Sequence, residues 1–239
     1  MSLARWLPYR AFRANARARL VCLPFAAGNA QTYRSFGALL PDVDVCAVEL
    51  PGRGTRFAEP LVDDAARLVA ELTDVLMPLA RDGCPLVVLG HSLGGRIGFG
   101  LARAGLPMRA LVVSGSRAPS MKTALHDVPL DDEHLVQRLR DLGGTPPEVF
   151  DHPELLELFL PIVRADAEID RALGSDAIVD VPIVAVGSRE DDAVAFSDLE
   201  RWRAHTTASF TLEPIGGTHF FVATHAAELT RIVARAALA

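Results

Sequence analysis

One serine in this chain lies within a glycine pattern that can support nucleophilic catalysis. Residues 90–94 read GHSLG, which places Ser92 at the centre of a G-x-S-x-G motif. An apolar, strand-like run at residues 85–89 precedes the motif, and a helix-like stretch at residues 95–104 follows it. A strand that turns sharply into a helix exposes such a serine above a sheet, and the flanking glycines let strand and helix approach closely. Ser92 is therefore the candidate nucleophile.

A serine hydroxyl is a weak nucleophile near neutral pH and needs a base within hydrogen-bonding reach. Of the seven histidines, His219 follows an apolar run at residues 210–215 and a glycine pair at residues 216–217. In chains built around this motif the histidine comes last in sequence and lies in a loop after a late strand. We therefore predict His219 as the base, with His225 as its nearest rival.

The acid that orients this histidine is expected between the serine and the histidine in the chain. The strand predicted at residues 181–186 leads into the segment GSREDD at residues 187–192. A buried carboxylate there would fix the tautomer of the histidine and stabilise its protonated form. Spacing alone leaves Glu190, Asp191 and Asp192 open as candidates.

Two backbone amides are expected to stabilise an oxyanion beside Ser92. The amide of Leu93, at the start of the helix, is the first. The second is expected in the loop PFAAGNA at residues 24–30, from Phe25, Ala26 or Ala27. The alternative interpretation of this loop, a phosphate cradle, is less favoured because the loop has neither a Walker lysine nor a G-x-G-x-x-G pattern.

The elements that must position these residues alternate along the chain. Strands are predicted at residues 20–24, 43–50, 86–89, 110–114, 181–186 and 210–215, and helices at 61–79, 95–104, 131–142, 153–164 and 226–237. Nearly continuous Val, Leu and Ile runs between helices indicate an α/β protein, with a mostly parallel sheet covered by helices on both faces. We expect a single domain over residues 1–239, with a helical insertion at about residues 120–173 that forms a lid.

Composition excludes several other classes of function. The chain has 239 residues and a net charge of −6, and its basic residues are scattered, which argues against nucleic-acid binding. No apolar run approaches the roughly 18–20 residues that a membrane span requires. The three cysteines are dispersed, so neither a disulfide framework nor a metal site is expected. We expect a cytoplasmic protein, and nothing in the sequence demands more than a monomer.

A family resemblance rests on six segments that occur in the right order. They are LPFAAG at residues 23–28, ELPGRG at 49–54, GHSLGG at 90–95, LGGTP at 142–146, LPIVRAD at 160–166 and GGTHFF at 216–221. With these segments the chain resembles the type II thioesterases, the free-standing editing enzymes of polyketide and non-ribosomal peptide synthases. The resemblance spans roughly residues 20–229 and implies an α/β-hydrolase fold with a helical lid.

The resemblance also implies a reaction. It implies a catalytic triad of Ser92, His219 and Asp191, with the amides of Ala26 and Leu93 as the oxyanion hole. The substrate would be an acyl thioester on the phosphopantetheine arm of an acyl or peptidyl carrier protein. The enzyme would remove stalled or aberrant acyl groups and would need no cofactor and no metal of its own.

Asp191 is chosen among the three acidic residues through the resemblance, because its distance from Trp202 matches the family pattern. The sequence departs from that pattern at Asp192, where the family usually has proline. Arg53 in the ELPGRG segment either binds a phosphate or a carrier helix, or ties down its own loop through carboxylates; we favour the second. Two other functions remain open: a small-molecule esterase or lipase-like hydrolase, and an inactive module that binds carrier proteins.

Overall fold

The computed structural model describes residues 2–10, 12–123, 126 and 129–238, and its centre is one parallel sheet. Six strands lie in the order β2-β1-β3-β4-β5-β6, and each neighbouring pair is parallel. Their bounds are β1 Ala18–Leu23, β2 Val43–Ala47, β3 Leu86–His91, β4 Ala110–Ser114, β5 Ile183–Ser188 and β6 Phe210–Ile215. The predicted parallel sheet of an α/β protein is confirmed.

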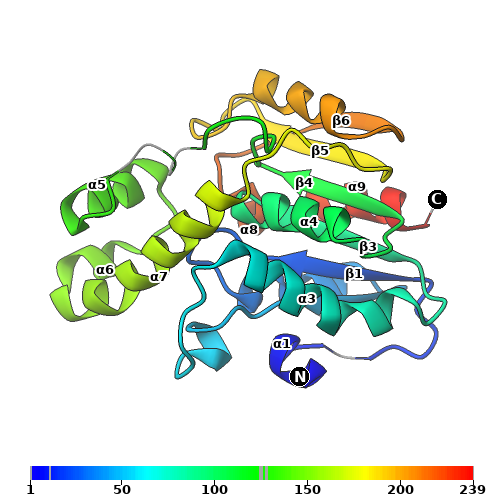
Figure 1. The fold of residues 1–239 in the computed structure, drawn as a ribbon, viewed down its shortest axis with the longest axis horizontal. Helices are drawn as coiled ribbons and strands as arrows, with labels where there is room; N and C mark the ends of the chain where they lie inside the picture. The colour runs from blue at the N-terminus through cyan, green and yellow to red at the C-terminus, as the bar shows by residue number, and fades with distance from the viewer. Residues whose placement is uncertain (1, 11, 124–125, 127–128, 239) are drawn as a thin grey trace.

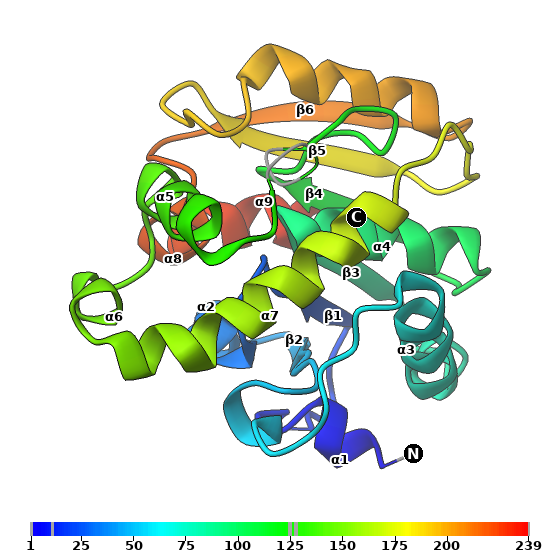
Figure 2. The same ribbon diagram turned by 60° about the vertical axis from the view of Figure 1, so that its left-hand side comes forward.

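Helices cover both faces of this sheet (Figures 1 and 2). The first face carries α3 (Ala65–Ala80), α4 (Leu93–Arg103) and the 3₁₀ segment η3 (Phe196–His205), and the second carries α2 (Phe36–Leu39), α8 (Phe221–Thr224) and α9 (Ala226–Leu238). Successive strand residues point to opposite faces, so Val87 packs in one core and Val88 in the other. Both faces are buried, which explains the continuous apolar strand sequences.

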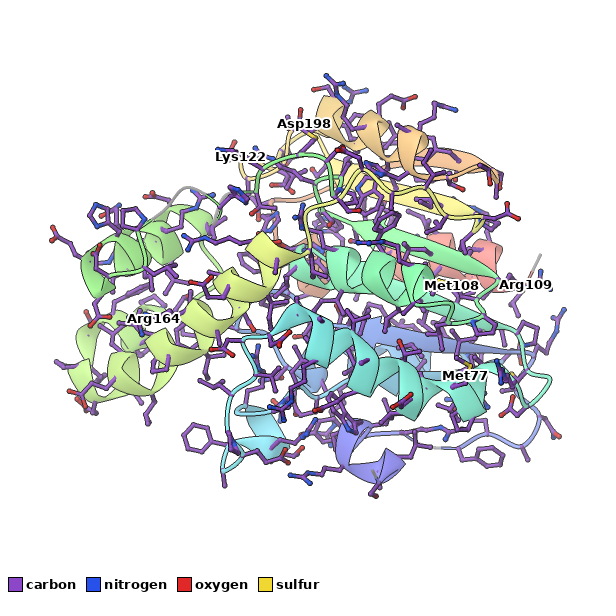
Figure 3. All side chains as sticks on the ribbon, in the orientation of Figure 1. Met77, Met108, Arg109, Lys122, Arg164 and Asp198 are labelled. Carbon is purple, nitrogen blue, oxygen red and sulfur yellow. The ribbon has the colours of Figure 1, made fainter. Side chains whose placement is uncertain are left out.

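Three helices form an insertion between β4 and β5. They are α5 (Asp132–Leu142), α6 (Pro147–Asp151) and α7 (Pro153–Ala172), and they lie beyond the carboxyl ends of the strands (Figure 1). Arg164 of α7, labelled in Figure 3, links α7 to the start of α5. Its side chain donates to the Leu130 carbonyl at 2.9 Å and pairs with Asp132 at 2.6 Å. Of the range predicted for the insertion, residues 124–125 and 127–128 lie outside the described residues.

Several predicted boundaries were wrong, and two of the differences have identifiable causes. Helix α3 begins at Ala65 rather than residue 61, because the Asp64 side chain caps it by accepting from the Ala66 and Arg67 amides. Helix α7 continues eight residues beyond residue 164, into a polar stretch whose buried acids Asp166 and Asp170 are paired with arginines. Strand β2 stops at Ala47 instead of residue 50.

The short elements complete the chain without adding a layer. They are α1 (Leu3–Trp6), η1 (Ala30–Tyr33) and η2 (Gly54–Arg56). Within the described ranges, no helix combines the length and the apolar character that crossing a bilayer requires.

The start of α4 packs directly on the end of β1, and glycine makes this contact possible. A Cβ atom on Gly94 would lie 2.3 Å from the carbonyl oxygen of Leu23 and 2.8 Å from that of Pro24. Both obstacles are backbone atoms, which have little room to yield. Gly94 is therefore required by the helix–sheet contact.

We predict that Gly94→Ala lowers the free energy of unfolding by about 3 kcal/mol, because the added methyl group pushes α4 off β1. Gly37→Ala is the matched control, since a Cβ on Gly37 in α2 would meet no atom within 4 Å. We expect the control to be neutral or slightly stabilising. Urea unfolding of both variants measures the difference, and equal losses of stability would contradict the packing argument.

Candidate active site

Ser92 occupies the sharp turn between β3 and α4. Its backbone has φ 52° and ψ −117°, a strained conformation that residues other than glycine rarely adopt. The Ser92 amide donates to the Ser114 carbonyl of β4 at 2.9 Å, and the Ser92 carbonyl accepts from the Gly95 amide at 3.0 Å. These bonds hold the strained turn in place, and Ser92 lines a cavity at the carboxyl edge of the sheet.

Close contacts within the turn leave no room for a side chain at Gly90 or Gly95. A Cβ on Gly90 would lie 2.1 Å from the carbonyl carbon of Gly94, and one on Gly95 would lie 2.6 Å from Ser116 Oγ. A larger residue at either position would separate strand from helix or fill the space beside Ser92. The spacing seen in the sequence thus follows from the geometry of the turn.

His219 and Asp191 meet in the arrangement that a general base requires. His219 Nδ1 lies 2.9 Å from Asp191 Oδ2, and both side chains are buried. The second oxygen of Asp191 accepts from the amides of Ala193 at 2.8 Å and Val194 at 3.0 Å, which fixes the carboxylate in place. This geometry leaves His219 Nε2 as the nitrogen that can accept a proton.

The other candidates for acid and base lie elsewhere. Glu190 and Asp192 flank Asp191 but are exposed to solvent. His225 is hydrogen-bonded through Nδ1 to Thr224 Oγ1 at 3.0 Å, and its ring lies behind Gly217, where a Cβ would be 2.6 Å away. Gly217 also has φ +90°, so the glycine both permits the turn and makes room for His225.

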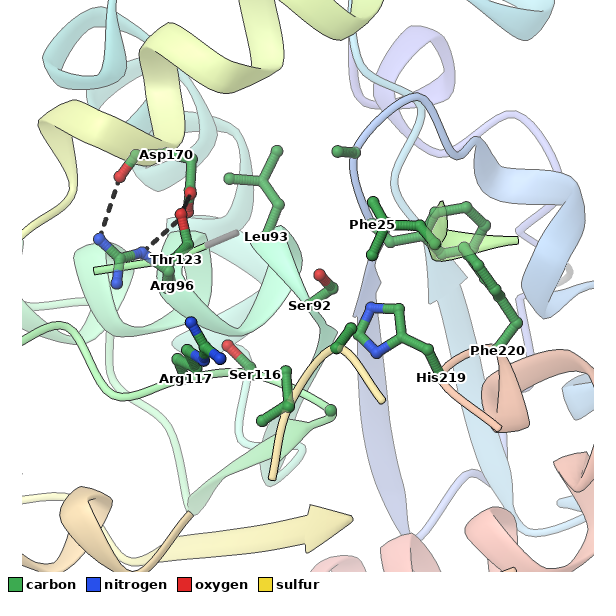
Figure 4. A pocket seen from close by; sticks show the side chains of 15 residues that line it. Phe25, Ser92, Leu93, Arg96, Ser116, Arg117, Thr123, Asp170, His219 and Phe220 are labelled. Carbon is green, nitrogen blue, oxygen red and sulfur yellow. Dashed lines mark hydrogen bonds and ion pairs between the residues drawn. The ribbon is translucent and has the colours of Figure 1, made fainter. Parts of the chain in front are cut away.

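A single cavity of about 70 Å³ brings the predicted residues together. Ser92, His219, Ala26 and Leu93 all line it, and Figure 4 shows the Ser92 hydroxyl beside the His219 ring. Asp191 is not one of the residues that line the cavity and contacts His219 through Nδ1. The five residues predicted from the sequence are therefore gathered at one site, although their chemical roles remain a prediction.

The loop after β1 narrows the choice of the second oxyanion donor. Ala27 has φ +58° and forms a tight turn in which the Gly28 amide donates to the Phe25 carbonyl at 2.8 Å. The Ala27 amide donates to Asp166 Oδ2 at 2.7 Å, so it is already engaged. Ala26 remains a candidate and lines the cavity with Leu93, whose amide opens the first turn of α4 and has no partner within its helix.

His91, the residue before Ser92, is a buried neighbour of His219. It is fully buried, its ring centroid is 5.1 Å from that of His219, and its Nδ1 lies 3.0 Å from Ser114 Oγ. Burial lowers the pKa of His91 well below its usual range, and nearby His219 lowers it further. A neutral His91 supports the His219 ring without adding a competing charge.

Asp166 of α7 connects the insertion both to Arg53, through a buried ion pair, and to the loop that carries Ala26, through a hydrogen bond. Arg53 makes two bonds to Asp166 of α7, from Nη1 to Oδ2 at 2.6 Å and from Nη2 to Oδ1 at 2.8 Å. Asp166 Oδ2 also accepts from the Ala27 amide, as described above. Arg53 is thus held by a carboxylate, as favoured from the sequence, but that carboxylate belongs to α7 and not to its own loop. Asp166 was missed as a site residue, although it lies within the LPIVRAD segment.

We predict that Asp166→Ala lowers the free energy of unfolding by about 3–5 kcal/mol, because it leaves the Arg53 guanidinium buried without a counter-charge. The control is Glu200→Ala, which removes an exposed pair with Arg203 and should cost no more than about 1 kcal/mol. Chemical denaturation followed by tryptophan fluorescence provides both values. If Asp166→Ala lowered the free energy of unfolding as little as the control does, the Arg53–Asp166 pair would not be what holds α7 in place.

Comparison with known proteins assigns the chain to a family. The model of the thioesterase domain matches residues 18–236. Linear gramicidin dehydrogenase LgrE of Brevibacillus parabrevis is 33% identical over 98% of this chain and 92% of its own. Thioesterase PikA5 of Streptomyces venezuelae is 33% identical over 87% of this chain and 76% of its own. The solved structure of BorB, the type II thioesterase of the borrelidin biosynthetic cluster, is 34% identical, has a TM-score of 0.80 and covers 95% of each chain. The chain therefore belongs to the thioesterase family and is a type II thioesterase of the polyketide and non-ribosomal peptide pathways.

Proposed function

We propose that this enzyme hydrolyses acyl thioesters on the phosphopantetheine arm of carrier proteins and so clears stalled or aberrant acyl groups from a synthase. The observation that carries the proposal is the contact of His219 Nδ1 with Asp191 at 2.9 Å beside a strained Ser92, all within a type II thioesterase chain. The acyl group enters as a thioester on the partner's arm, so the reaction needs no cofactor of the enzyme's own.

The proposed mechanism follows from the positions of these groups. His219 Nε2 takes the proton of Ser92 Oγ as the oxygen attacks the thioester carbonyl, and Asp191 stabilises the resulting imidazolium. The amides of Leu93 and Ala26 stabilise the oxyanion, with each donor contributing about 3 kcal/mol. The thiolate leaves, His219 then activates a water molecule, and the acid is released as Ser92 is restored.

We propose that the helical insertion acts as a lid over this reaction. Leu142 at the end of α5 lines the cavity with Ser92. A Cβ on Gly144 would lie 2.3 Å from the Phe220 ring, so the loop after α5 packs tightly on the residue that follows His219. Opening this contact would expose the cavity, and closing it would exclude water from the acyl-enzyme.

Other functions receive less support from the same observations. A small-molecule esterase would use the same triad, but the similarity to PikA5 and BorB favours thioesters. An inactive binding module would have no need of a buried His219–Asp191 pair beside a strained serine. The relative LgrE is named a dehydrogenase, but this sequence contains no G-x-G-x-x-G pattern of the kind that binds a dinucleotide.

The assignment of the acid leads to a paired prediction. We expect Asp191→Asn to lower kcat by about 10³–10⁴-fold, because the histidine then loses its tautomer and its counter-charge. Asp192→Asn is the matched control, with the same chemical change one residue along on an exposed side chain, and it should change kcat less than twofold. Steady-state release of thiol measures both, and the reverse ranking would overturn the choice of Asp191.

The substrate class leads to a second prediction. We expect kcat/KM for an acyl-carrier protein to exceed that for the corresponding nitrophenyl ester at least tenfold, because the carrier supplies binding energy remote from the reacting carbonyl. Ser92→Ala, which should turn over neither substrate, corrects for background hydrolysis. A preference for the free ester would count against the editing function and in favour of a small-molecule esterase.

A further inference from the structure

The turn after β1 holds one residue in a backbone conformation that its side chain disfavours. The Gly28 amide donates to the Phe25 carbonyl at 2.8 Å, which closes a four-residue turn over Ala26 and Ala27. Ala27 has φ +58°, whereas Ala26 is not among the described residues with positive φ, and this combination defines a type II turn. The third position of such a turn favours glycine, because a Cβ atom there is strained. Ala27 therefore needs an interaction from outside the turn to keep this conformation.

Asp166 of α7 supplies that interaction. Its Oδ2 accepts from the Ala27 amide at 2.7 Å, and its side chain is fully buried. The Ala27 N–H belongs to the central peptide of the turn, and the orientation of this peptide distinguishes a type II turn from the commoner type I. In a type I turn the same peptide is turned over, and its N–H would point away from Asp166. The bond to Asp166 thus selects the type II turn.

The amide of Ala26, the proposed second oxyanion donor, lies within this turn. Ala26 lines the cavity with Ser92, and its amide has no acceptor among the described residues. The backbone of Ala26 is fixed on one side by the bond that closes the turn and on the other by the bond to Asp166. If the second bond is lost, the turn can change type by rotation about the Ala26 backbone, and the flanking peptide that carries the Ala26 N–H shifts with it.

Given the proposed thioester hydrolysis, on which this inference rests, we propose that Asp166 is a positioning residue that holds the Ala26 amide where the oxyanion develops. Groups that act on a reacting centre must be held to within about 0.5 Å of their productive geometry. A misplacement of about 1 Å can lower the rate about 100-fold. Asp166 acts through the backbone of the turn, and α7 thereby contributes to the oxyanion site in addition to covering the cavity.

Arg53 has a separate part in this arrangement. Its Nη1 donates to Asp166 Oδ2 at 2.6 Å and its Nη2 donates to Asp166 Oδ1 at 2.8 Å, so both carboxylate oxygens are oriented. The turn itself requires only an acceptor opposite the Ala27 amide, and the amide oxygen of an asparagine can also accept this bond. The charge of the ion pair and the acceptor for the turn can therefore be removed independently.

A second ion pair keeps α7 attached when the first is replaced. Arg96 Nε of α4 lies 2.9 Å from Asp170 Oδ1, and Arg96 Nη2 donates to the Asp170 carbonyl at 3.0 Å (Figure 4). Asp170 lies one helical turn after Asp166, and both residues of the Arg96–Asp170 pair are buried. Substitutions at Arg53 and Asp166 thus leave this part of α7 held on the sheet.

The test separates the acceptor at position 166 from the ion pair. Two chains both carry Arg53→Met, which removes the buried guanidinium. One adds Asp166→Asn, which keeps an acceptor, and the other adds Asp166→Leu, which has the same branching but no acceptor. Thiol release from a butyryl thioester of pantetheine gives kcat and KM without any contact to a carrier protein. We expect Asp166→Leu to lower kcat about 100-fold relative to Asp166→Asn and to change KM less than threefold, because the lost interaction is made in the transition state.

A rescue experiment gives a readout that simple anchoring of α7 would not change. Ala27→Gly makes the type II turn favourable without Asp166, because glycine adopts positive φ readily. Added to the Arg53→Met, Asp166→Leu chain, it should restore kcat at least tenfold. Added to the native chain, where Asp166 already holds the turn, it should change kcat less than threefold.

Urea unfolding establishes that each chain is folded under the assay conditions, and Asp166→Ala replaces Asp166→Leu if the larger side chain prevents folding. Equal kcat values for the Asp166→Asn and Asp166→Leu chains, a loss expressed in KM, or no recovery with Ala27→Gly would overturn this inference and leave the proposed hydrolysis standing. No hydrolysis by the native chain would overturn the proposed function itself. The expected loss and recovery would establish that Asp166 positions the oxyanion donor.

Discussion

The whole site depends on one close backbone contact, where the end of β3 and the start of α4 cross the end of β1. Gly90 lies against the Gly94 carbonyl and Gly94 against the Leu23 carbonyl, at distances that leave no room for a Cβ atom. This contact holds Ser92 at φ 52° and directs its side chain above the sheet edge. The strain is maintained because the surrounding sheet and helix are fully buried. The position of Ser92 is therefore a property of the core and not of a flexible loop.

The remaining groups are fixed to this turn by buried carboxylates. Asp191, in the loop after β5, holds His219, and Asp166 of α7 holds the Ala27 amide and Arg53. Breaking the interactions of a buried carboxylate is costly, because its partners are left without a counter-charge or hydrogen bond. Each of these two aspartates therefore connects distant parts of the chain rigidly. Through this contact of Asp166, the geometry of the loop that carries Ala26 and Ala27 depends on the position of the insertion. A movement of α7 would then alter both access to the cavity and the alignment of its amides.

The fold and the sharp turn at Ser92 could be predicted from the sequence because both arise from local patterns. The apolar runs gave the six strands, and the strand–GHSLG–helix context gave the turn at Ser92. The carboxylate that contacts His219 could not be chosen from spacing, since the choice depends on which of three adjacent carboxylates turns inward. Family resemblance pointed to Asp191, the residue that makes this contact. The contacts of Asp166 could not be predicted, because they join α7 to residues more than one hundred positions away in the chain. Helix α7 was predicted too short because Asp166 and Asp170 look like surface residues until their arginine partners are known.

The most direct test of this account is labelling with a serine-directed fluorophosphonate followed by peptide mapping. The account predicts one phosphonyl group per chain, attached to Ser92, because His219 makes this hydroxyl far more nucleophilic than the others. Labelling should disappear in Ser92→Ala and become much slower in His219→Ala, with both variants still folded by circular dichroism. Equal labelling of the native enzyme and Ser92→Ala, or attachment at another residue, would contradict the claim that the strained turn presents the nucleophile.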